Sequence, residues 1–218
     1  VPSKALIRSA KFLSHASRAR EFGMKSATVD FDFAGVMERV QRVVKTVAPH
    51  DSLDRYTRLG VDCVTGEAKI TSPWTVEVNT AGGKRTLTTR NIVIAAGARP
   101  VVPAIPGLRE INPLTSDTIW SLRKLPKRLV VLGGGPIGCE LAQCFARFGA
   151  QVTQVEMLPR LLIREDPEIA AIVTRQFHAE GIQVLTGHRA RQFRIDNGNK
   201  ILICEHDGKD VQIEFDEL

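Results

Sequence analysis

The stretch RLVVLGGGPIGCELAQC, residues 128–144, decides the fold of this chain. It starts with a short apolar run at 129–132 and continues, after a glycine turn, with the apolar spacing of a helix. The turn has the pattern G-x-G-x-x-G and consists of Gly133, Gly134, Gly135, Pro136, Ile137 and Gly138. A strand, a turn of this kind and a helix, in this order, predict a dinucleotide-binding unit.

The glycines have separate tasks in such a turn. Gly133 permits the tight turn, Gly135 lets the backbone approach a pyrophosphate, and Gly138 lets helix and strand pack closely. The N-terminus of the following helix offers free N–H groups and the positive end of its dipole to the phosphates. The alternative is a glycine-rich turn in a doubly wound domain that binds nothing.

A second strand, QVTQVE, is expected to end at Glu156, about 20 residues beyond the turn, where such units carry an acidic residue. A carboxylate at this position accepts hydrogen bonds from a ribose 2′-OH and repels a 2′-phosphate. The sequence therefore favours NAD(H) over NADP(H). Arg160 and Arg164 lie close by in the sequence and keep NADP(H) open as an alternative.

The rest of the chain alternates helical and extended patterns around this unit. We expect a first helix over 1–22 with Ser3 as a possible N-cap, and a second helix that Asp32 caps and Pro49 ends. The other expected elements are a helix over 52–59, a three-stranded meander within 66–89, an apolar strand in 91–100, helices over 114–126 and 166–180, a strand over 182–185 and a hairpin in 200–218. This pattern predicts an α/β fold with a domain boundary at 111/112.

Composition excludes several classes of function. The chain has 218 residues, of which 43% are hydrophobic and 25% charged, as in ordinary globular proteins. No apolar run approaches the ~20 residues of a membrane span. The net charge of +6 raises the question of nucleic acid, but the basic residues are spread out, and one Tyr with two Trp provide no stacking platform. We therefore predict no nucleic-acid partner.

Cysteine usage favours a reducing compartment, and we predict a cytoplasmic protein. The four cysteines are Cys63, Cys139, Cys144 and Cys204. Cys63 and Cys204 lie in strand-like stretches, as small core residues do. Cys139 and Cys144 have the C-x4-C spacing of a flavoenzyme redox pair, but on a helix their Cα atoms would be about 8–9 Å apart. A disulfide requires less than ~7 Å, so we predict that both stay reduced. No metal site is predicted.

Four stretches of the chain, in this order, are VPSKAL, TTRNIVIAAGARPVVPAIPG, LVVLGGGPIGCE and VTQVEMLPRLLIRED. Together they resemble one family, the FAD-dependent pyridine nucleotide-disulfide oxidoreductases, which includes dihydrolipoamide dehydrogenase, glutathione reductase and mercuric reductase. The first resembles the sequence that follows the family's redox disulfide, and the second resembles a strand and turn close to FAD. The other two are similar to the NAD fingerprint and the acidic strand end. The resemblance covers essentially the whole chain and is strongest to mercuric reductase and dihydrolipoamide dehydrogenase.

The resemblance implies a Rossmann-like, three-layer FAD/NAD(P)-binding fold. Residues 1–111 would be part of an FAD-binding domain with its small meander, and residues 112–218 an NAD-binding domain. Hydride would pass from NADH to FAD, then electrons to a redox disulfide and to an acceptor, which is Hg(II), lipoamide or another disulfide. The resemblance also implies an internal piece of a homodimeric enzyme, with the redox disulfide just before Val1. We expect the piece alone to be inactive and to hold FAD weakly or not at all.

Family residues are carried over only where the motifs match. Lys4 matches a lysine beside flavin N5 and Glu140 the glutamate that pairs with it, whereas Ala95, Ala96 and Gly97 match the segment near FAD. An ammonium near N5 would stabilise negative charge on reduced flavin. From the residues alone, a solvated helix lysine and a glutamate in the first helical turn explain the pair equally well.

Two departures from the family pattern affect these expectations. Ala96 replaces a usual threonine, so a hydroxyl is lost. Pro136 replaces a larger residue that covers the flavin, so gating of the nicotinamide site by that residue is open. The alternative function is an NAD-binding module without flavin chemistry, with a regulatory or sensing role.

Overall fold

The computed structural model describes residues 1–218, which divide into two compact units. Unit 1 combines residues 1–44 with 100–218, and unit 2 consists of residues 45–99. The predicted boundary at 111/112 separates a partial FAD-binding domain from an NAD-binding domain, and it stays a prediction. The compact units differ from it because the first two helices pack into the same apolar core as the glycine-turn helix.

Unit 1 is built on a parallel sheet in the order β4-β5-β6. The strands are β4 (Arg128–Leu132), β5 (Gln151–Glu156) and β6 (Gln183–Thr186), and the helices that connect them are α4 (Pro136–Arg147) and α5 (Pro167–Ala179). Leu129 pairs with Val152, and Val155 pairs with Leu185. Parallel neighbours need such crossover helices, so the predicted strand, turn, helix and strand are confirmed.

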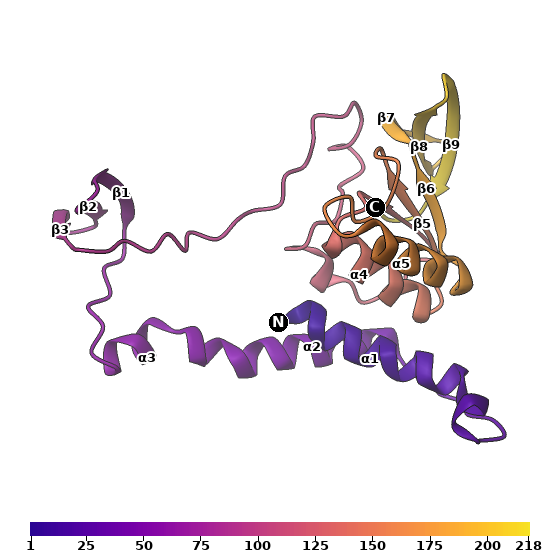
Figure 1. Cartoon of the computed structure of the whole chain (residues 1–218), viewed down its shortest axis with the longest axis horizontal. Coiled ribbons are helices and arrows are strands. Elements are labelled where there is room, and N and C mark those ends of the chain that lie inside the picture. Colours follow the sequence, from indigo (N-terminus) through magenta and orange to yellow (C-terminus); the bar gives the residue numbers. More distant parts are fainter. The chain divides into compact units, whose positions relative to one another are not determined.

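Three layers result from the alternation of side chains along β4 and β5. Leu129 and Val152 face the helices and join a core with Phe145 of α4. Val130 and Val155 face the opposite way and join a second core with an antiparallel sheet. That sheet consists of β7 (Arg189–Asp196), β8 (Asn199–His206) and β9 (Lys209–Phe215). Figure 1 shows the helices α4 and α5 on one side of β5 and β6, and β7 to β9 on the other. The α/β, Rossmann-like fold is therefore confirmed.

Two N-terminal helices extend the helical layer. They are α1 (Pro2–Ser17) and α2 (Phe33–Val47), and a short 3-10 helix, η1 (Ala19–Phe22), follows α1. Leu6 and Met37 are fully buried in the same core as Phe145. Asp32 caps α2 as predicted, because its carboxylate accepts hydrogen bonds from the N–H groups of Ala34 and Gly35.

Predictions for the first helix need two corrections. Ser3 is not the N-cap, because the helix starts with Pro2 and Val1 holds the cap position. Proline suits the first helical turn, where its missing N–H costs nothing. The continuous helix over 1–22 also breaks into α1 and η1, which ends at Gly23 with φ 75°.

Unit 2 contains the predicted meander. It starts with η2 (Ala48–Asp51) and α3 (Leu53–Arg58) and continues with β1 (Glu67–Ser72), β2 (Thr75–Thr80) and β3 (Gly83–Thr88). The strands are antiparallel in the order β1-β2-β3. Val78 is the one buried hydrophobic residue of this unit, so the meander has almost no core of its own.

Two sequence predictions of secondary structure are wrong, and a third, the C-terminal hairpin, is confirmed but incomplete. The apolar segment 91–100 forms no strand, and Val93 and Ile94 are 88% and 76% exposed. No neighbouring strand is available there to pair with its N–H and C=O groups. The helix over 114–126 shrinks to η3 (Ile119–Ser121), because the Thr115 and Thr118 hydroxyls bond the local backbone instead. The C-terminal hairpin has β7 as an unpredicted third strand.

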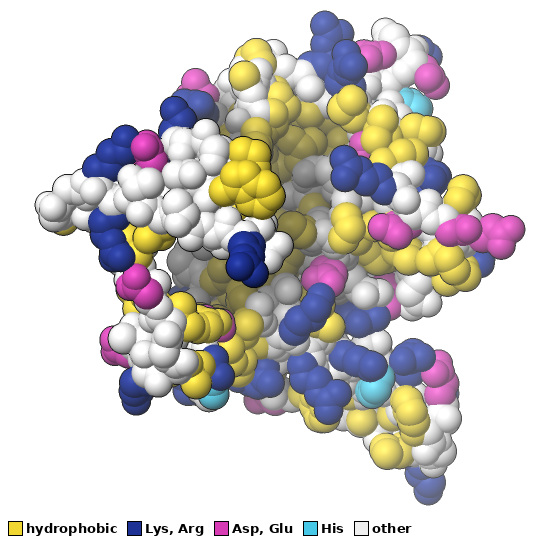
Figure 2. All heavy atoms as spheres, turned by 60° about the vertical axis from the view of Figure 1, so that its left-hand side comes forward, with side chains coloured by type: hydrophobic (Ala, Val, Ile, Leu, Met, Phe, Trp, Pro, Cys, Tyr) yellow, Lys and Arg dark blue, Asp and Glu magenta, His cyan; other side chains and the backbone are white.

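The surface mixes apolar and charged side chains. On the face in Figure 2, hydrophobic side chains lie next to Lys and Arg side chains, with acidic side chains among them. Large apolar residues at the surface include Phe12 of α1, which is 64% exposed, and Trp74, which is 61% exposed. Single exposed apolar residues are ordinary in folded proteins. No helix combines the length and the apolar character needed to cross a membrane.

Candidate functional site

The glycine turn lies where β4 ends and α4 begins. Gly133 has φ +111°, which L side chains rarely adopt, and its N–H donates to the carbonyl of Val155 at 2.7 Å. This bond extends the β4–β5 pairing by one residue before the chain turns. Gly135 is the N-cap of α4, and Pro136 is its first residue.

The space around each glycine distinguishes glycines that are needed for close packing from a glycine that borders open space. A Cβ on Gly138 would lie 2.7 Å from the Gly133 carbonyl oxygen and 3.2 Å from Val131, so only glycine lets α4 approach β4 this closely. A Cβ on Gly134 would lie 2.8 Å from Leu161. Nothing lies within 4 Å of the same position on Gly135, so this glycine borders open space. The approach of a pyrophosphate to this backbone stays a prediction.

The N-terminus of α4 faces that space with its own donors. The first bond of the helix runs from the Cys139 N–H to the Gly135 carbonyl at 3.0 Å. The N–H groups of Ile137 and Gly138 precede it and have no intrahelical acceptor. No side chain caps this helix, and Glu140, predicted for its first turn, lies beyond that turn. These free donors and the positive end of the helix dipole favour an anion at this helix terminus.

Glu156 lies at the end of β5, directly beside the turn. One carboxylate oxygen accepts a hydrogen bond from the Gly134 N–H at 2.6 Å, and the other accepts one from the Leu158 N–H at 2.7 Å. These bonds fix the carboxylate in place, and each oxygen keeps a lone pair for a further donor. The geometry fits a ribose hydroxyl as the additional donor.

The two arginines near Glu156 differ. The Arg160 guanidinium donates to the carbonyls of Leu162 and Ile163 at 2.9 and 2.8 Å, so it is engaged within its own loop. Arg164 is exposed. The possibility of a 2′-phosphate partner therefore depends on Arg164 rather than on Arg160.

Sequence reasoning missed Gln154. Its side chain is fully buried under the turn, and its amide nitrogen donates to the Gly133 carbonyl at 3.0 Å. A signal was present, because Gln154 alternates with Val152 on the face of the strand that is turned toward the helices. Buried amides require a hydrogen-bond partner, and the adjacent turn offers one.

Lys4 and Glu140 form an ion pair between α1 and α4. The prediction that they meet is confirmed, while their catalytic role stays a prediction. The side chains are 70% and 36% exposed, so solvent reaches the ammonium group. The third predicted set, Ala95 to Gly97, lies in unit 2 on irregular, exposed backbone, with Gly97 at φ +70°.

All four cysteines are free thiols. Burial raises the pKa of Cys144 to about 12, so this thiol stays neutral and packs as an apolar residue. Burial also raises the pKa of Cys139. Cys204 is buried in β8 as predicted, whereas Cys63 is only half-buried and lies in no strand.

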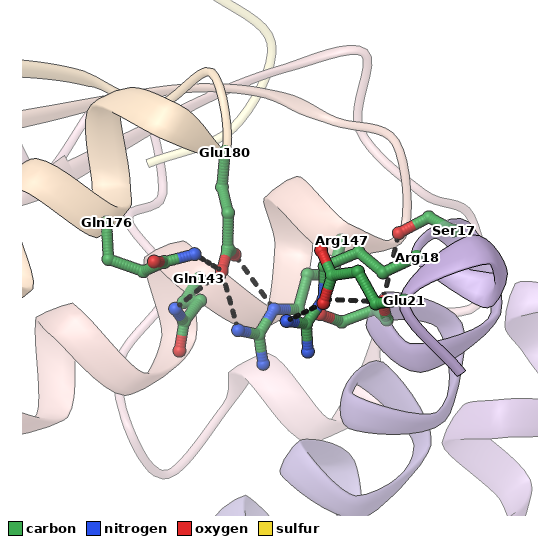
Figure 3. Close-up of polar contacts among 8 residues, drawn as sticks. Ser17, Arg18, Glu21, Gln143, Arg147, Gln176 and Glu180 are labelled. Carbon is green, nitrogen blue, oxygen red and sulfur yellow. Dashed lines mark hydrogen bonds and ion pairs between the residues drawn. The ribbon is translucent and has the colours of Figure 1, made fainter. Parts of the chain in front are cut away.

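A polar cluster braces α4 against the end of α5 (Figure 3). The Arg147 guanidinium donates two hydrogen bonds to the Glu180 carboxylate, at 2.8 and 2.7 Å, and Gln143 and Gln176 donate to the same carboxylate. Burial alone would raise the pKa of Glu180, but the hydrogen bond from Arg147, with those from the glutamines, outweighs burial and lowers it. This cluster joins the C-terminal ends of α4 and α5, at the opposite end of α4 from the glycine turn.

A family model described as pyridine nucleotide-disulphide oxidoreductase matches residues 1–218. The chain belongs to this family. Similar pyridine nucleotide-disulphide oxidoreductases include a mercuric reductase from Lysinibacillus sphaericus, 34% identical over 219 residues, with 100% of this chain and 39% of the relative covered. A dihydrolipoyl dehydrogenase from Acholeplasma laidlawii is 33% identical over 221 residues, with 99% of this chain and 63% of the relative covered.

A solved structure of a disulfide reductase is also similar to this chain. The Cu(II) complex of the HOCl-induced flavoprotein disulfide reductase RclA from Escherichia coli matches with a TM-score of 0.75 and 26% identity. The match covers 100% of this chain and 45% of that chain. The chain thus spans less than two thirds of the length of these pyridine nucleotide-disulphide oxidoreductases, whose members are oxidoreductases that bind FAD and NAD(P)H.

Proposed function

We propose that this chain carries the NADH-binding part of a flavin-dependent disulfide reductase. In the whole protein, a hydride from NADH would reduce FAD, and its two electrons would pass to a redox disulfide and on to an acceptor. The observation that carries the proposal is the open space at Gly135, with the N-terminus of α4 on one side and the Glu156 carboxylate close by. A dinucleotide needs these three features together.

Each residue of the turn would have a defined task. The Ile137 and Gly138 N–H groups would donate to the pyrophosphate, and the Glu156 carboxylate would accept from the adenosine ribose. Gly133 and Gly134 would hold the backbone that lets Gly135 approach the phosphates. Because Pro136 has no N–H and a small, rigid ring, it would leave the nicotinamide path more open than a large side chain would.

FAD, when bound, supplies the group that accepts the hydride. Lys4 would keep a positive charge near the flavin, and Glu140 would orient the ammonium, since the two already form an ion pair. Ala95, Ala96 and Gly97 carry no large side chain, so their backbone would approach the flavin closely.

The acceptor class follows from the relatives. Their names point to Hg(II), lipoamide or another disulfide. We propose a cytoplasmic homodimer for the whole protein, as the family resemblance implies. An NAD-binding module without flavin is distinguished by colour, because only a flavoprotein purifies yellow with the visible absorbance of bound flavin.

The choice of nucleotide tests the proposal. We expect tighter binding of NADH than of NADPH, on the order of tenfold or more, because the Glu156 carboxylate repels a 2′-phosphate. Calorimetry with both nucleotides on wild-type protein and on Glu156→Gln measures the gap. The amide keeps an acceptor for the Gly134 N–H but removes the charge, so the gap should narrow in the variant. Equal affinities, or tighter NADPH binding, in the wild type would contradict the assignment.

A further inference from the structure

One peptide group of the glycine turn is held from both ends by β5. The Gln154 side-chain amide donates to the Gly133 carbonyl at 3.0 Å, and the Glu156 carboxylate accepts from the Gly134 N–H at 2.6 Å. These carbonyl and N–H groups belong to the same peptide, the one that joins Gly133 to Gly134. Residues 154 and 156 alternate along the strand, so their side chains project from the same face.

We propose that Gln154 is a positioning residue for dinucleotide binding, acting with Glu156 as a clamp on the Gly133–Gly134 peptide. The inference rests on the proposed function. Gln154 itself would touch no part of the nucleotide, because it is fully buried beneath the turn. It would set the backbone that leads into Gly135, where the phosphates approach.

The turn needs such a clamp because glycine lies on both sides of the peptide. A peptide between two glycines meets no Cβ when it rotates, so sterics alone select no single orientation. Rotation would turn the Gly134 N–H away from Glu156 and leave the carboxylate without that donor. Hydrogen bonds at both ends of the peptide select the one orientation in which Glu156 stays in place.

The energetics of Gln154 also point to this role. Its side-chain oxygen is buried without a hydrogen-bond partner in the protein, so the amide contributes here through its nitrogen. Its nitrogen serves the Gly133 carbonyl, which Gly138 covers so closely that a Cβ there would lie 2.7 Å away. Without Gln154, this covered carbonyl would lose its side-chain donor.

Cys139 completes the buried cluster. Its sulfur lies 3.5 Å from the Gln154 nitrogen and 3.6 Å from the Gly134 carbonyl. The thiol therefore contacts Gln154 from the first turn of α4 and restricts the amide to the orientation that reaches Gly133. The cluster connects β5, the turn and α4.

The test compares Gln154→Leu and Gln154→Met with wild type in the full-length holoenzyme. Both substitutions keep the approximate volume and remove the donor. We expect the Kd for NADH, measured by calorimetry, to rise about tenfold. KM for NADH should rise with kcat within twofold, and exchange of the Gly134 amide should accelerate at least tenfold. Gln151→Leu is the matched control, because Gln151 is an exposed glutamine of the same strand.

The outcomes separate the two proposals. If wild-type protein binds NADH and both Gln154 variants bind it within twofold of wild type, with unchanged Gly134 exchange, the clamp is overturned and the proposed function stands. If wild-type protein binds no NADH, the proposed function is overturned, and the role of the clamp in binding with it. A thermal midpoint near that of wild type shows that the affinity loss is local to the turn, and either variant alone suffices for this test.

Discussion

Residues 129–135 and residues 92–97 have the same kind of sequence, an apolar run that ends at glycine, but different structures. The first run forms β4, in which Leu129 and Val130 are 3% and 2% exposed. The second forms no strand, with Val93 at 88% exposure. β4 pairs with β5 and has a helical layer on one face and an antiparallel sheet on the other. Residues 92–100 have no backbone hydrogen bond to any other segment.

The difference shows what an apolar strand sequence specifies. It specifies which residues suit a buried strand, but the strand forms only where other segments supply hydrogen-bond partners and cover both faces. In the first region those segments are β5, α4 and β9. In the second region the chain supplies none of them. An apolar sequence and neighbouring segments that pair with it are separate conditions for a strand, and separate experiments test them.

Amide exchange should give the largest contrast. We expect the amides of Val130 and Val131 to exchange at least a thousandfold more slowly than those of Val93 and Ile94, because only the former lie in a paired, buried strand. Hydrogen–deuterium exchange with peptide-level mass spectrometry measures both segments in one sample. Comparable protection of the two segments would show that residues 92–97 are paired in solution and would remove the contrast.

Truncating one valine in each region gives the next largest effect. Val130→Ala should lower the free energy of unfolding by roughly 2 kcal/mol, from lost burial and the remaining cavity. Val93→Ala, the same substitution on an exposed side chain, should change it by less than about 0.5 kcal/mol. Urea unfolding followed by circular dichroism compares them. A cost at Val93 as large as at Val130 would contradict the exposed conformation of residues 92–97.

The two units should also differ in how much a single carboxylate contributes to the free energy of unfolding. Glu180→Gln removes the carboxylate that Arg147 holds in unit 1, where both side chains are less than one fifth exposed, and should cost roughly 1–2 kcal/mol. Asp62→Asn removes the partner of Arg85 in unit 2, where the side chains are 73% and 48% exposed. That exposed pair should contribute at most about 0.5 kcal/mol.

The pH dependence of the stability that Glu180 adds follows from the shift of its pKa. Its pKa is lowered from the ordinary value of 4.5 in the folded chain, so the stability it adds is present above pH 4.5. That stability is lost as the pH falls through the lower, folded-state pKa. The gap in stability between wild type and Glu180→Gln should therefore be full at pH 7 and shrink toward pH 3. A gap that stays constant with pH would show that packing, not charge, causes the effect.

The dinucleotide unit was predictable from sequence because its signals are local. The turn 133–138, the strands on either side and Glu156 follow one another along a short stretch, and their contacts connect neighbouring elements. The cap at Asp32 and the meander of unit 2 were predictable for the same reason. Backbone requirements of this kind are encoded by residue types close together in sequence.

The misses depend on contacts that sequence spacing does not show. Gln154 donates to the carbonyl of Gly133 in the glycine turn, 21 positions earlier, and β7 forms a strand by pairing with β8. The sequence predicts a strand over residues 91–100 because their composition is that of a buried strand. It does not show that no other segment pairs with them. The meeting of Lys4 and Glu140 came from the family resemblance and not from any local pattern.

That ion pair has a consequence for synthesis of the chain. Lys4 and Glu140 are 136 positions apart, and the apolar face of α1, with Leu6, packs into the same core as Phe145 of α4. At about 5–20 residues per second, a ribosome would make Glu140 roughly 7–27 s after Lys4. Among the elements that pack into this core, α4 is completed only at the end of that interval. The surface of α1 that packs against α4 therefore lacks this contact until α4 has been made.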